Sequence, residues 1–310
     1  MEEYHFIRLA QSNVKDVYHL FKNSKRFSGS FNKYALKFDT KFSGVEYIGY
    51  FAYDQNNQPV AFYGVTPCFA LADGKRILIA QAVDAITHSG HRRKGLFEKI
   101  VDLSTRLCAA EGINFIYGVP NDTSYQGFIK KFNWSQSGKL IKFQFKTKQL
   151  PISHFCKRYR YLNNVYMFFV KIILAFLPKG SIFENPNAGE ENISILRDGS
   201  FFQYKNYIKK YLIKICGLSV WASVDGAMKI GDIERSDQVN IEQVINRLKR
   251  LAFFLGISKV VFQFSSDAFW AAKLNGKYEA EEALPIIYYN LSNIYDPQKL
   301  ILSYGDIDSF

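Results

Sequence analysis

The stretch Thr87-His88-Ser89-Gly90-His91-Arg92-Arg93-Lys94-Gly95-Leu96-Phe97 decides the fold of this 310-residue chain. It follows an apolar run, Arg76 to Ile86, that is typical of a buried strand, and it leads into Leu96 to Glu111, where apolar residues recur at helical spacing. The first N–H groups of a helix have no partner inside the helix, and the helix dipole adds positive potential there. A strand, a short basic loop and a helix therefore predict a site for an anion such as a diphosphate.

The residues of this loop suit an anion site in two ways. Gly95 lets the backbone approach a bulky anion closely, because it carries no side chain. Arg92, Arg93 and Lys94 supply positive charge around that anion. Basic residues that open a helix also occur at solvated helix starts without any ligand, and the loop alone leaves that alternative open.

The loop resembles motif A of the GCN5-related N-acetyltransferases, which reads Arg/Gln-x-x-Gly-x-Gly/Ala and binds the pyrophosphate of coenzyme A. Arg92 and Gly95 fill the first two fixed positions, whereas Phe97 stands where a small residue is usual. The variant is similar to the subgroup that includes the enhanced-intracellular-survival acetyltransferases. The resemblance implies acetyl-CoA as the co-substrate. The residues expected to contact it are Ala85, Ile86, Thr87, Arg92, Arg93, Lys94, Gly95, Leu96 and Asn121.

The order of elements expected over residues 1–150 matches that family. It runs strand, helix, three-strand meander, helix, strand, helix and strand, with Lys139 to Phe145 as the closing strand. Asn121 to Trp134 resembles the family's second motif, an asparagine followed by an aromatic and basic helix. The expected fold class is α/β (α+β), an acyl-CoA N-acyltransferase fold with a mixed central sheet.

Two residues are candidates for catalysis. Many family members place a tyrosine near the end of the second motif to protonate the leaving thiolate, but Phe128 and Ile129 occupy that neighbourhood. Tyr125 is the nearest phenol, so the leaving-group acid is Tyr125, a water or absent. On the strand before the loop, Asp84 either receives a proton from an attacking ammonium or only pairs with a nearby Lys or Arg.

The second half of the chain repeats this order without the basic loop. Residues 151–200 are expected to form a basic and apolar connector, and 201–310 a degenerate copy of the acetyltransferase domain. In place of the loop stands Gly231 to Asp237, whose acids Asp232, Glu234 and Asp237 would repel a diphosphate. An unrelated α/β domain is the alternative.

The net charge of +12 is unevenly distributed along the chain. Eleven basic residues and no acidic residue lie between Asp122 and Glu184, and this region includes the apolar run Val165 to Leu177. Thirteen residues are fewer than the ~20 needed to span a bilayer. The segment Lys157 to Lys179 either lies against an anionic membrane surface or forms a helix buried between two domains.

Composition limits the number of domains, the cellular compartment and the ligands that we expect. With 48% hydrophobic residues the chain is a packed globular protein, and its length favours two domains. Four scattered cysteines and an N-terminus without an apolar segment indicate a cytoplasmic protein with reduced thiols. His88 and His91 lie three apart, but the other histidines complete no ligand set, so no metal site is expected. No nucleic-acid motif accompanies the basic region.

These features predict an N-acetyltransferase. It would transfer an acetyl group from acetyl-CoA to a primary amine of a small-molecule acceptor by direct attack, without a covalent enzyme intermediate. The alternative is a non-catalytic protein that keeps the fold and binds or senses an acyl-CoA. The basic loop favours the enzyme, and the absent tyrosine favours the alternative.

Overall fold

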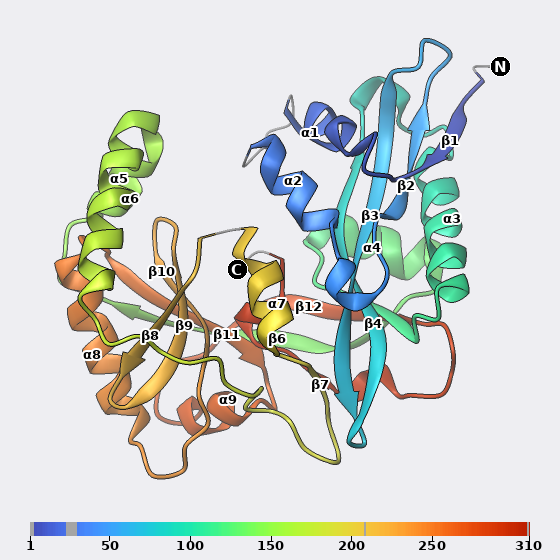
Figure 1. The fold of residues 1–310 in the computed structure, drawn as a ribbon. Coiled ribbons are helices and arrows are strands. Elements are labelled where there is room, and N and C mark those ends of the chain that lie inside the picture. The colour runs from blue at the N-terminus through green and yellow to red at the C-terminus, as the bar shows by residue number, and fades with distance from the viewer. Residues whose placement is uncertain (1–2, 23–29, 208, 309) are drawn as a thin grey trace. The chain divides into compact units, whose positions relative to one another are not determined.

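A computed structural model describes residues 3–22, 30–207, 209–308 and 310. The chain forms two compact units. Unit 1 comprises Met1–Ser137, Gln203–Ile208 and Pro285–Lys299, and unit 2 comprises Gly138–Phe202, Lys209–Leu284 and Leu300–Phe310. Both units mix helices with a sheet of parallel and antiparallel strands (Figure 1). The fold class is therefore mixed α/β, as the sequence predicts.

Unit 1 is built around the strand order β1-β2-β3-β4-β5-β12. Its strands are β1 (His5–Arg8), β2 (Ile48–Tyr53), β3 (Pro59–Ala72), β4 (Lys75–Thr87), β5 (Phe115–Gly118) and the second part of β12 (Glu281–Asn290). Its helices are α1 (Val14–Lys22), α2 (Phe31–Phe38), α3 (Leu96–Ala110) and α4 (Asp122–Phe132), with the short turns η1 (Lys41–Ser43), η2 (Ser89–His91) and η4 (Pro297–Lys299).

The side chains of β2 and β3 in unit 1 alternate between two apolar cores, and each core contains different helices. Phe51 and Phe62 pack with α1 and α2, whereas their neighbours Ala52 and Tyr63 pack with α3 and α4. Because successive side chains of a strand point to opposite faces, each face has its own apolar core. Figure 1 shows α1 and α2 on the opposite side of these strands from α3.

Unit 2 has the strand order β6-β11-β10-β9-β8. Its strands are β6 (Ser135–Lys146), β8 (Tyr211–Ile215), β9 (Leu218–Val224), β10 (Met228–Ile233) and β11 (Lys259–Ser265), with the small pair β7 (Ile193–Ile195) and β13 (Leu300–Ile301). Its helices are α5 (Ile152–Arg158), α6 (Arg160–Ala175), α8 (Ile241–Phe254) and α9 (Phe269–Leu274), and the turn η5 (Tyr304–Asp306) precedes the C-terminus. Helix α7 (Gly199–Tyr204) and η3 (Lys205–Tyr207) follow β7.

The units do not follow the division at residues 150 and 200 that the sequence suggests. The predicted closing strand of the first domain, Lys139 to Phe145, lies in β6 and pairs antiparallel with β11 of unit 2. The strand beside β5 in unit 1 is instead the end of β12, where Ile287 pairs with Gly118. Each unit is thus completed by a strand from the other half of the sequence.

In the part of the chain that the structure describes, no helix combines the length and apolar character needed to cross a bilayer. The four cysteines lie in the structure without disulfide bonds.

Candidate functional site

The loop from Thr87 to Gly95 is held on two sides by hydrogen bonds. On one side, His88 donates its backbone N–H to the carbonyl of Val60 on β3 at 2.8 Å. On the other, Tyr4 Oη and His91 Nδ1 lie 3.0 Å apart, which ties η2 to the residue before β1. These contacts fix the path of the loop from the end of β4 to the start of α3.

The three basic residues of the loop, Arg92, Arg93 and Lys94, are exposed. Arg92 Nε lies 3.4 Å from the carbonyl of Thr87, a long hydrogen bond that folds this side chain back over the loop. Arg93 has a φ of 62°, a left-handed conformation that a side-chain-bearing residue adopts rarely. Lys94 Nζ lies 5.9 Å from the centroid of the Tyr4 ring. The loop therefore presents its positive charge at the surface.

Gly95 is the N-cap of α3 and has a φ of 73°, in the region that favours glycine. A Cβ added to Gly95 would meet nothing within 4 Å, so the space beside it is open. Because glycine has no side chain to cap the helix, the first N–H groups of α3 are left for another acceptor. Leu96, the first residue of α3, is buried and anchors the helix start. An uncapped helix start beside open space is the geometry that anions favour in proteins.

The end of β4 extends beyond its pairing with β5. The parallel ladder runs from Ala80–Ile116 to Ala82–Gly118, where β5 ends, whereas β4 continues to Thr87. The last five residues of β4 are all half-buried. Their backbone on the β5 side therefore lies where the amide groups of an extended ligand could bind, and Ala85, Ile86 and Thr87 belong to this segment.

Phe97 replaces the small residue that the resemblance leads one to expect, yet its ring is directed away from the loop. It makes edge contacts with Tyr63, Phe128 and Phe132, at centroid distances of 6.2, 5.9 and 5.5 Å. Phe97 is thus part of the core between β3, α3 and α4. Its size does not obstruct the N-terminus of α3.

Asp84 pairs with a buried lysine. Lys37 Nζ on α2 donates to Asp84 Oδ2 at 2.7 Å, and the two side chains are 3% and 15% exposed. A β-bulge at Val83 precedes Asp84, because Ala82 pairs with Val65 and Asp84 with Gly64. The structure therefore shows the ion pair with a lysine, which is one of the two roles expected for the Asp84 carboxylate. A part in proton transfer stays a prediction.

Tyr125 and Asn121 both belong to the start of α4. Tyr125 Oη donates to Gln136 Oε1 at 2.7 Å. The Asn121 side chain accepts the backbone N–H of Ser124 at 3.2 Å and caps the helix. Asn121 thus has a structural role in the helix start, and the phenol of Tyr125 has a partner of its own.

The corresponding loop of unit 2 is built differently from the basic loop. The sequence suggested that Asp232 lies in a loop. In the structure it lies in β10 and is buried. Glu234 accepts the backbone N–H of Ser219, and Asp237 pairs with Lys273. The placement of Asp232 between strand and helix is therefore wrong, whereas repulsion of a diphosphate by these acids stays a prediction.

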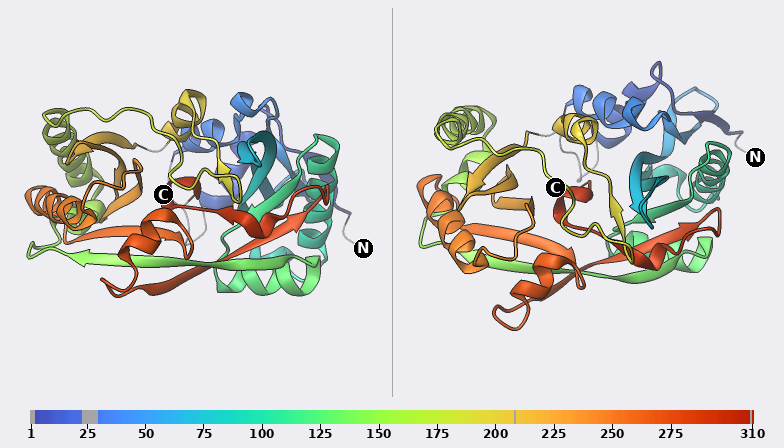
Figure 2. Two further views of the ribbon diagram at one scale, coloured as in Figure 1. Left: turned by 90° about the horizontal axis from the view of Figure 1, so that it is seen from below. Right: turned by 60° about the horizontal axis from the view of Figure 1, so that its bottom comes forward.

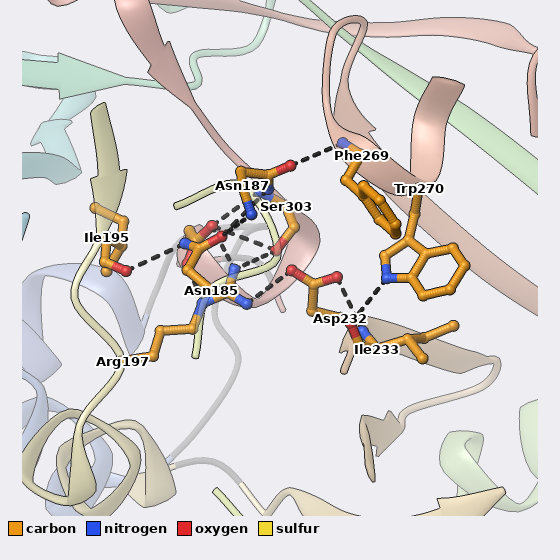
Figure 3. A network of polar contacts seen from close by, with 10 residues as sticks. Asn185, Asn187, Ile195, Arg197, Asp232, Ile233, Phe269, Trp270 and Ser303 are labelled. Carbon is orange, nitrogen blue, oxygen red and sulfur yellow. Dashed lines mark hydrogen bonds and ion pairs between the residues drawn. The ribbon is translucent and has the colours of Figure 1, made fainter. Parts of the chain in front are cut away.

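Asp232 belongs to a buried network centred on Arg197 (Figure 3). Arg197 donates to Asp232 Oδ2 at 2.7 Å, to both oxygens of Asp306 at 3.0 and 2.7 Å, and to Ser303 Oγ at 2.6 Å. Burial alone would lower the pKa of the guanidinium, but the carboxylates of Asp306 and Asp232 outweigh it and raise that pKa. The network ties β10 to the C-terminal segment.

The C-terminal segment also fills the end of the β10–β11 pair. The parallel ladder of these strands ends at Ile230–Phe262. Beyond it, Ser265 donates its backbone N–H to the carbonyl of Leu302 at 2.8 Å. The ring of Phe310 lies so close to Gly231 that a Cβ added there would be only 2.5 Å from it. The N-terminus of α8 is capped by the side chain of Asn240, which accepts from the N–H of Glu242. Strand end and helix start are thus both occupied by the chain itself.

Two residues of the site were not found from the sequence. Lys37 could have been noticed, because it lies three residues after Tyr34 and beside Phe38, on the apolar side of a helix, where a lysine is unusual. Tyr4 carries no local signal, since its contact with His91 joins residues 87 positions apart. Among the described residues, no group of three or more His, Cys, Asp or Glu side chains is placed to hold a metal ion.

The order of helices and strands around the mixed sheet, with the loop between β4 and α3, is that of the acyl-CoA N-acyltransferase fold. Residues 5–137 match the family model of the acetyltransferase (GNAT) domain. The sequence has no significant match among curated proteins.

Solved structures share this fold at low sequence identity. A GCN5-related N-acetyltransferase from Kribbella flavida is 10% identical, with a TM-score of 0.56 over 94% of this chain and 72% of that one. A GCN5-related N-acetyltransferase from Anabaena variabilis is 12% identical, with a TM-score of 0.56 over 93% and 73%. A structure from Pyrococcus horikoshii, 10% identical, covers 97% of this chain and 93% of its own with a TM-score of 0.57. The likeness extends over both units.

Proposed function

We propose that this chain is an N-acetyltransferase that transfers the acetyl group of acetyl-CoA to a primary amine. The observation that supports the proposal most directly is the open, uncapped N-terminus of α3. Gly95, in a left-handed conformation with open space beside it, leaves the first helix N–H groups uncapped behind three exposed basic residues. This geometry suits the diphosphate of coenzyme A, and the match of residues 5–137 to the acetyltransferase domain supports the same assignment.

The remaining parts of the site fit the rest of that substrate. The half-buried end of β4, from Val83 to Thr87, extends past β5 and offers backbone groups to the amides of the pantetheine arm. Asp84 would accept the proton that the attacking amine loses, and Tyr125 would donate one to the departing thiolate. In the direct reaction a C–N bond forms as the C–S bond of the thioester breaks. The acceptor amine stays unassigned.

Unit 2, in this proposal, is a second acetyltransferase-like domain without a coenzyme A site. The support is the filled end of β10 and β11, together with the capped start of α8. Phe310 and Leu302 occupy the place that corresponds to the open end of β4 in unit 1. Asn240 accepts the N–H of Glu242 at the start of α8, whereas Gly95 leaves the first N–H groups of α3 without a side-chain acceptor.

A non-catalytic acyl-CoA-binding protein is the second candidate, and one observation favours it. Phe128, at the position where the family resemblance implies a tyrosine, is buried and packs on Trp134 at 4.7 Å. No phenol can act from there. A thiol-release assay against a panel of amines separates the two candidates, since only the enzyme releases coenzyme A faster in the presence of an acceptor.

The binding site is tested by one substitution with a matched control. Gly95→Val places a branched side chain beside the start of α3, and we expect the affinity for coenzyme A to fall at least tenfold in calorimetry. Gly112→Val is the control, because Gly112 lies after the other end of α3 with a φ of 74° and equally open space. Both variants carry the same backbone strain. Undiminished affinity in Gly95→Val, or an equal loss in Gly112→Val, would contradict the proposed site.

A further inference from the structure

Helix α6 is apolar on two opposite sides. On one side, Tyr166, Val170 and Leu174 are at most 7% exposed and pack in the core of unit 2. The hydroxyl of Tyr166 donates to the carbonyl of Leu255 at 2.9 Å, which fixes the helix beside the end of α8. Figures 1 and 2 show α5 and α6 next to each other at this edge of unit 2. The packing explains one apolar side of α6 but not the other.

The other side of α6 is an exposed apolar stripe. Its members follow one another at intervals of four, three, four and four residues, so they share one face of the helix. They are Tyr161, Val165, Phe168, Ile172 and Phe176, which are 77%, 53%, 65%, 42% and 85% exposed. Phe155 of α5 and Tyr159, which lies between α5 and α6, are 58% and 50% exposed and add to it. A contiguous exposed apolar surface of this kind marks an interaction site.

Basic residues lie on the same segment of the chain as this stripe. No acidic residue occurs between Asp122 and Glu184. Arg158, Lys171 and Lys179 are exposed, and none of the three forms an ion pair with another residue in the described ranges. A partner that covers this surface therefore has to offer both an apolar phase and negative charge.

We propose that α5 and the exposed stripe of α6 dock this protein on the surface of an anionic phospholipid bilayer. The 16 residues of α6 extend about 24 Å, and α6 lies in the membrane plane with its stripe among the acyl chains. Arg158, Lys171 and Lys179 then contact the headgroups. A second copy of this chain is a poor occupant, because a symmetric dimer would bring two segments without acidic residues face to face.

Vesicle cosedimentation with the full chain tests the proposal. We expect binding to vesicles of phosphatidylcholine and phosphatidylserine, weaker binding at higher salt, and little binding to phosphatidylcholine alone. Each basic residue near such a surface contributes roughly fivefold in affinity, so Arg158→Gln with Lys171→Gln should weaken binding about 25-fold. Phe168→Ser with Phe176→Ser should abolish it.

Two controls keep the test specific. Lys15→Gln removes an exposed charge from α1, and Ile294→Ser removes a side chain that is 73% exposed in unit 1, so neither should change vesicle binding. Absence of binding to the anionic vesicles at low salt would overturn the proposal. So would an equal loss in the controls, or a dimer in analytical ultracentrifugation that Phe168→Ser with Phe176→Ser converts to monomer.

Discussion

Asp84 of unit 1 and Asp232 of unit 2 occupy equivalent positions. Each follows a one-residue bulge just beyond the end of a parallel ladder, in the strand that precedes the central helix of its unit. Each carboxylate accepts a hydrogen bond of 2.7 Å from a buried cation, Lys37 in one case and Arg197 in the other. The recurrence of this arrangement supports the proposal that the second unit is a copy of the acetyltransferase fold.

Asp84→Asn tests whether the carboxylate takes part in catalysis. A general base contributes a factor of about 10² to 10⁴ in rate, so kcat should fall by at least about 100-fold while the affinity for coenzyme A is retained. The double variant with Lys37→Met removes both partners of the ion pair. If Asp84 only pairs with Lys37, the double variant should recover activity, and such a recovery would refute the catalytic role.

Tyr125→Phe tests the leaving-group acid. Loss of the hydroxyl should lower kcat about tenfold or more without changing the affinity for coenzyme A. Gln136→Leu removes only the partner of that hydroxyl and serves as the control. Equal rates in Tyr125→Phe and the unaltered protein would assign the proton to another donor, such as a water.

Coenzyme A should bind once per chain. Calorimetric titration of the unaltered protein is expected to give a stoichiometry of one, which Gly95→Val removes. Phe310→Ala should leave the stoichiometry unchanged, because Asn240 still caps α8 and the C-terminal segment still follows β11. A second binding event in either protein would show that unit 2 keeps a site.

Arg197→Met should destabilise the protein by about 3 to 5 kcal/mol, because it leaves two buried carboxylates without their partner. Lys273→Met breaks an exposed pair with Asp237 and should cost less than about 1 kcal/mol. Urea unfolding of both variants measures the difference. A similar small effect in both would mean that other groups compensate the buried acids.

The cysteines should differ sharply in reactivity. Burial, with a smaller contribution from Glu111, raises the pKa of the Cys108 thiol to about 12, so the thiol stays protonated and unreactive at pH 8. Cys216 is exposed and should react with a disulfide reagent in the native state. Mass spectrometry after brief labelling should find Cys216 modified and Cys108 unmodified. Cys216→Ser would also lower the background of the thiol-release assay.

Local patterns predicted most elements of the fold. The helix expected to follow Asn121 is present as α4, because capping and spacing are local properties. The strand from Lys139 to Phe145 was also found, but its partner was not. Pairing with β11 joins residues more than 100 positions apart, and a strand's own sequence does not say which neighbour it will have.

The candidate site shows the same limit. Gly95 and the basic residues could be proposed from the sequence, because a loop at a helix start is built from consecutive residues. The pairing of Asp84 could not, since the bulge at Val83 decides to which face the carboxylate points. Helix α2, which supplies Lys37, was not predicted either.

The exchange of β6 and β12 has a consequence for the order in which the protein is made. Unit 1 includes Pro285–Lys299, so its sheet is incomplete until these residues have been synthesised. During that time the edge of β5 that later pairs with β12 has no partner, and β6 has no partner until β11 has been made. An exposed strand edge of this kind is a template for wrong pairing. Until Pro285–Lys299 has been made, this edge is therefore open to pairing with another strand.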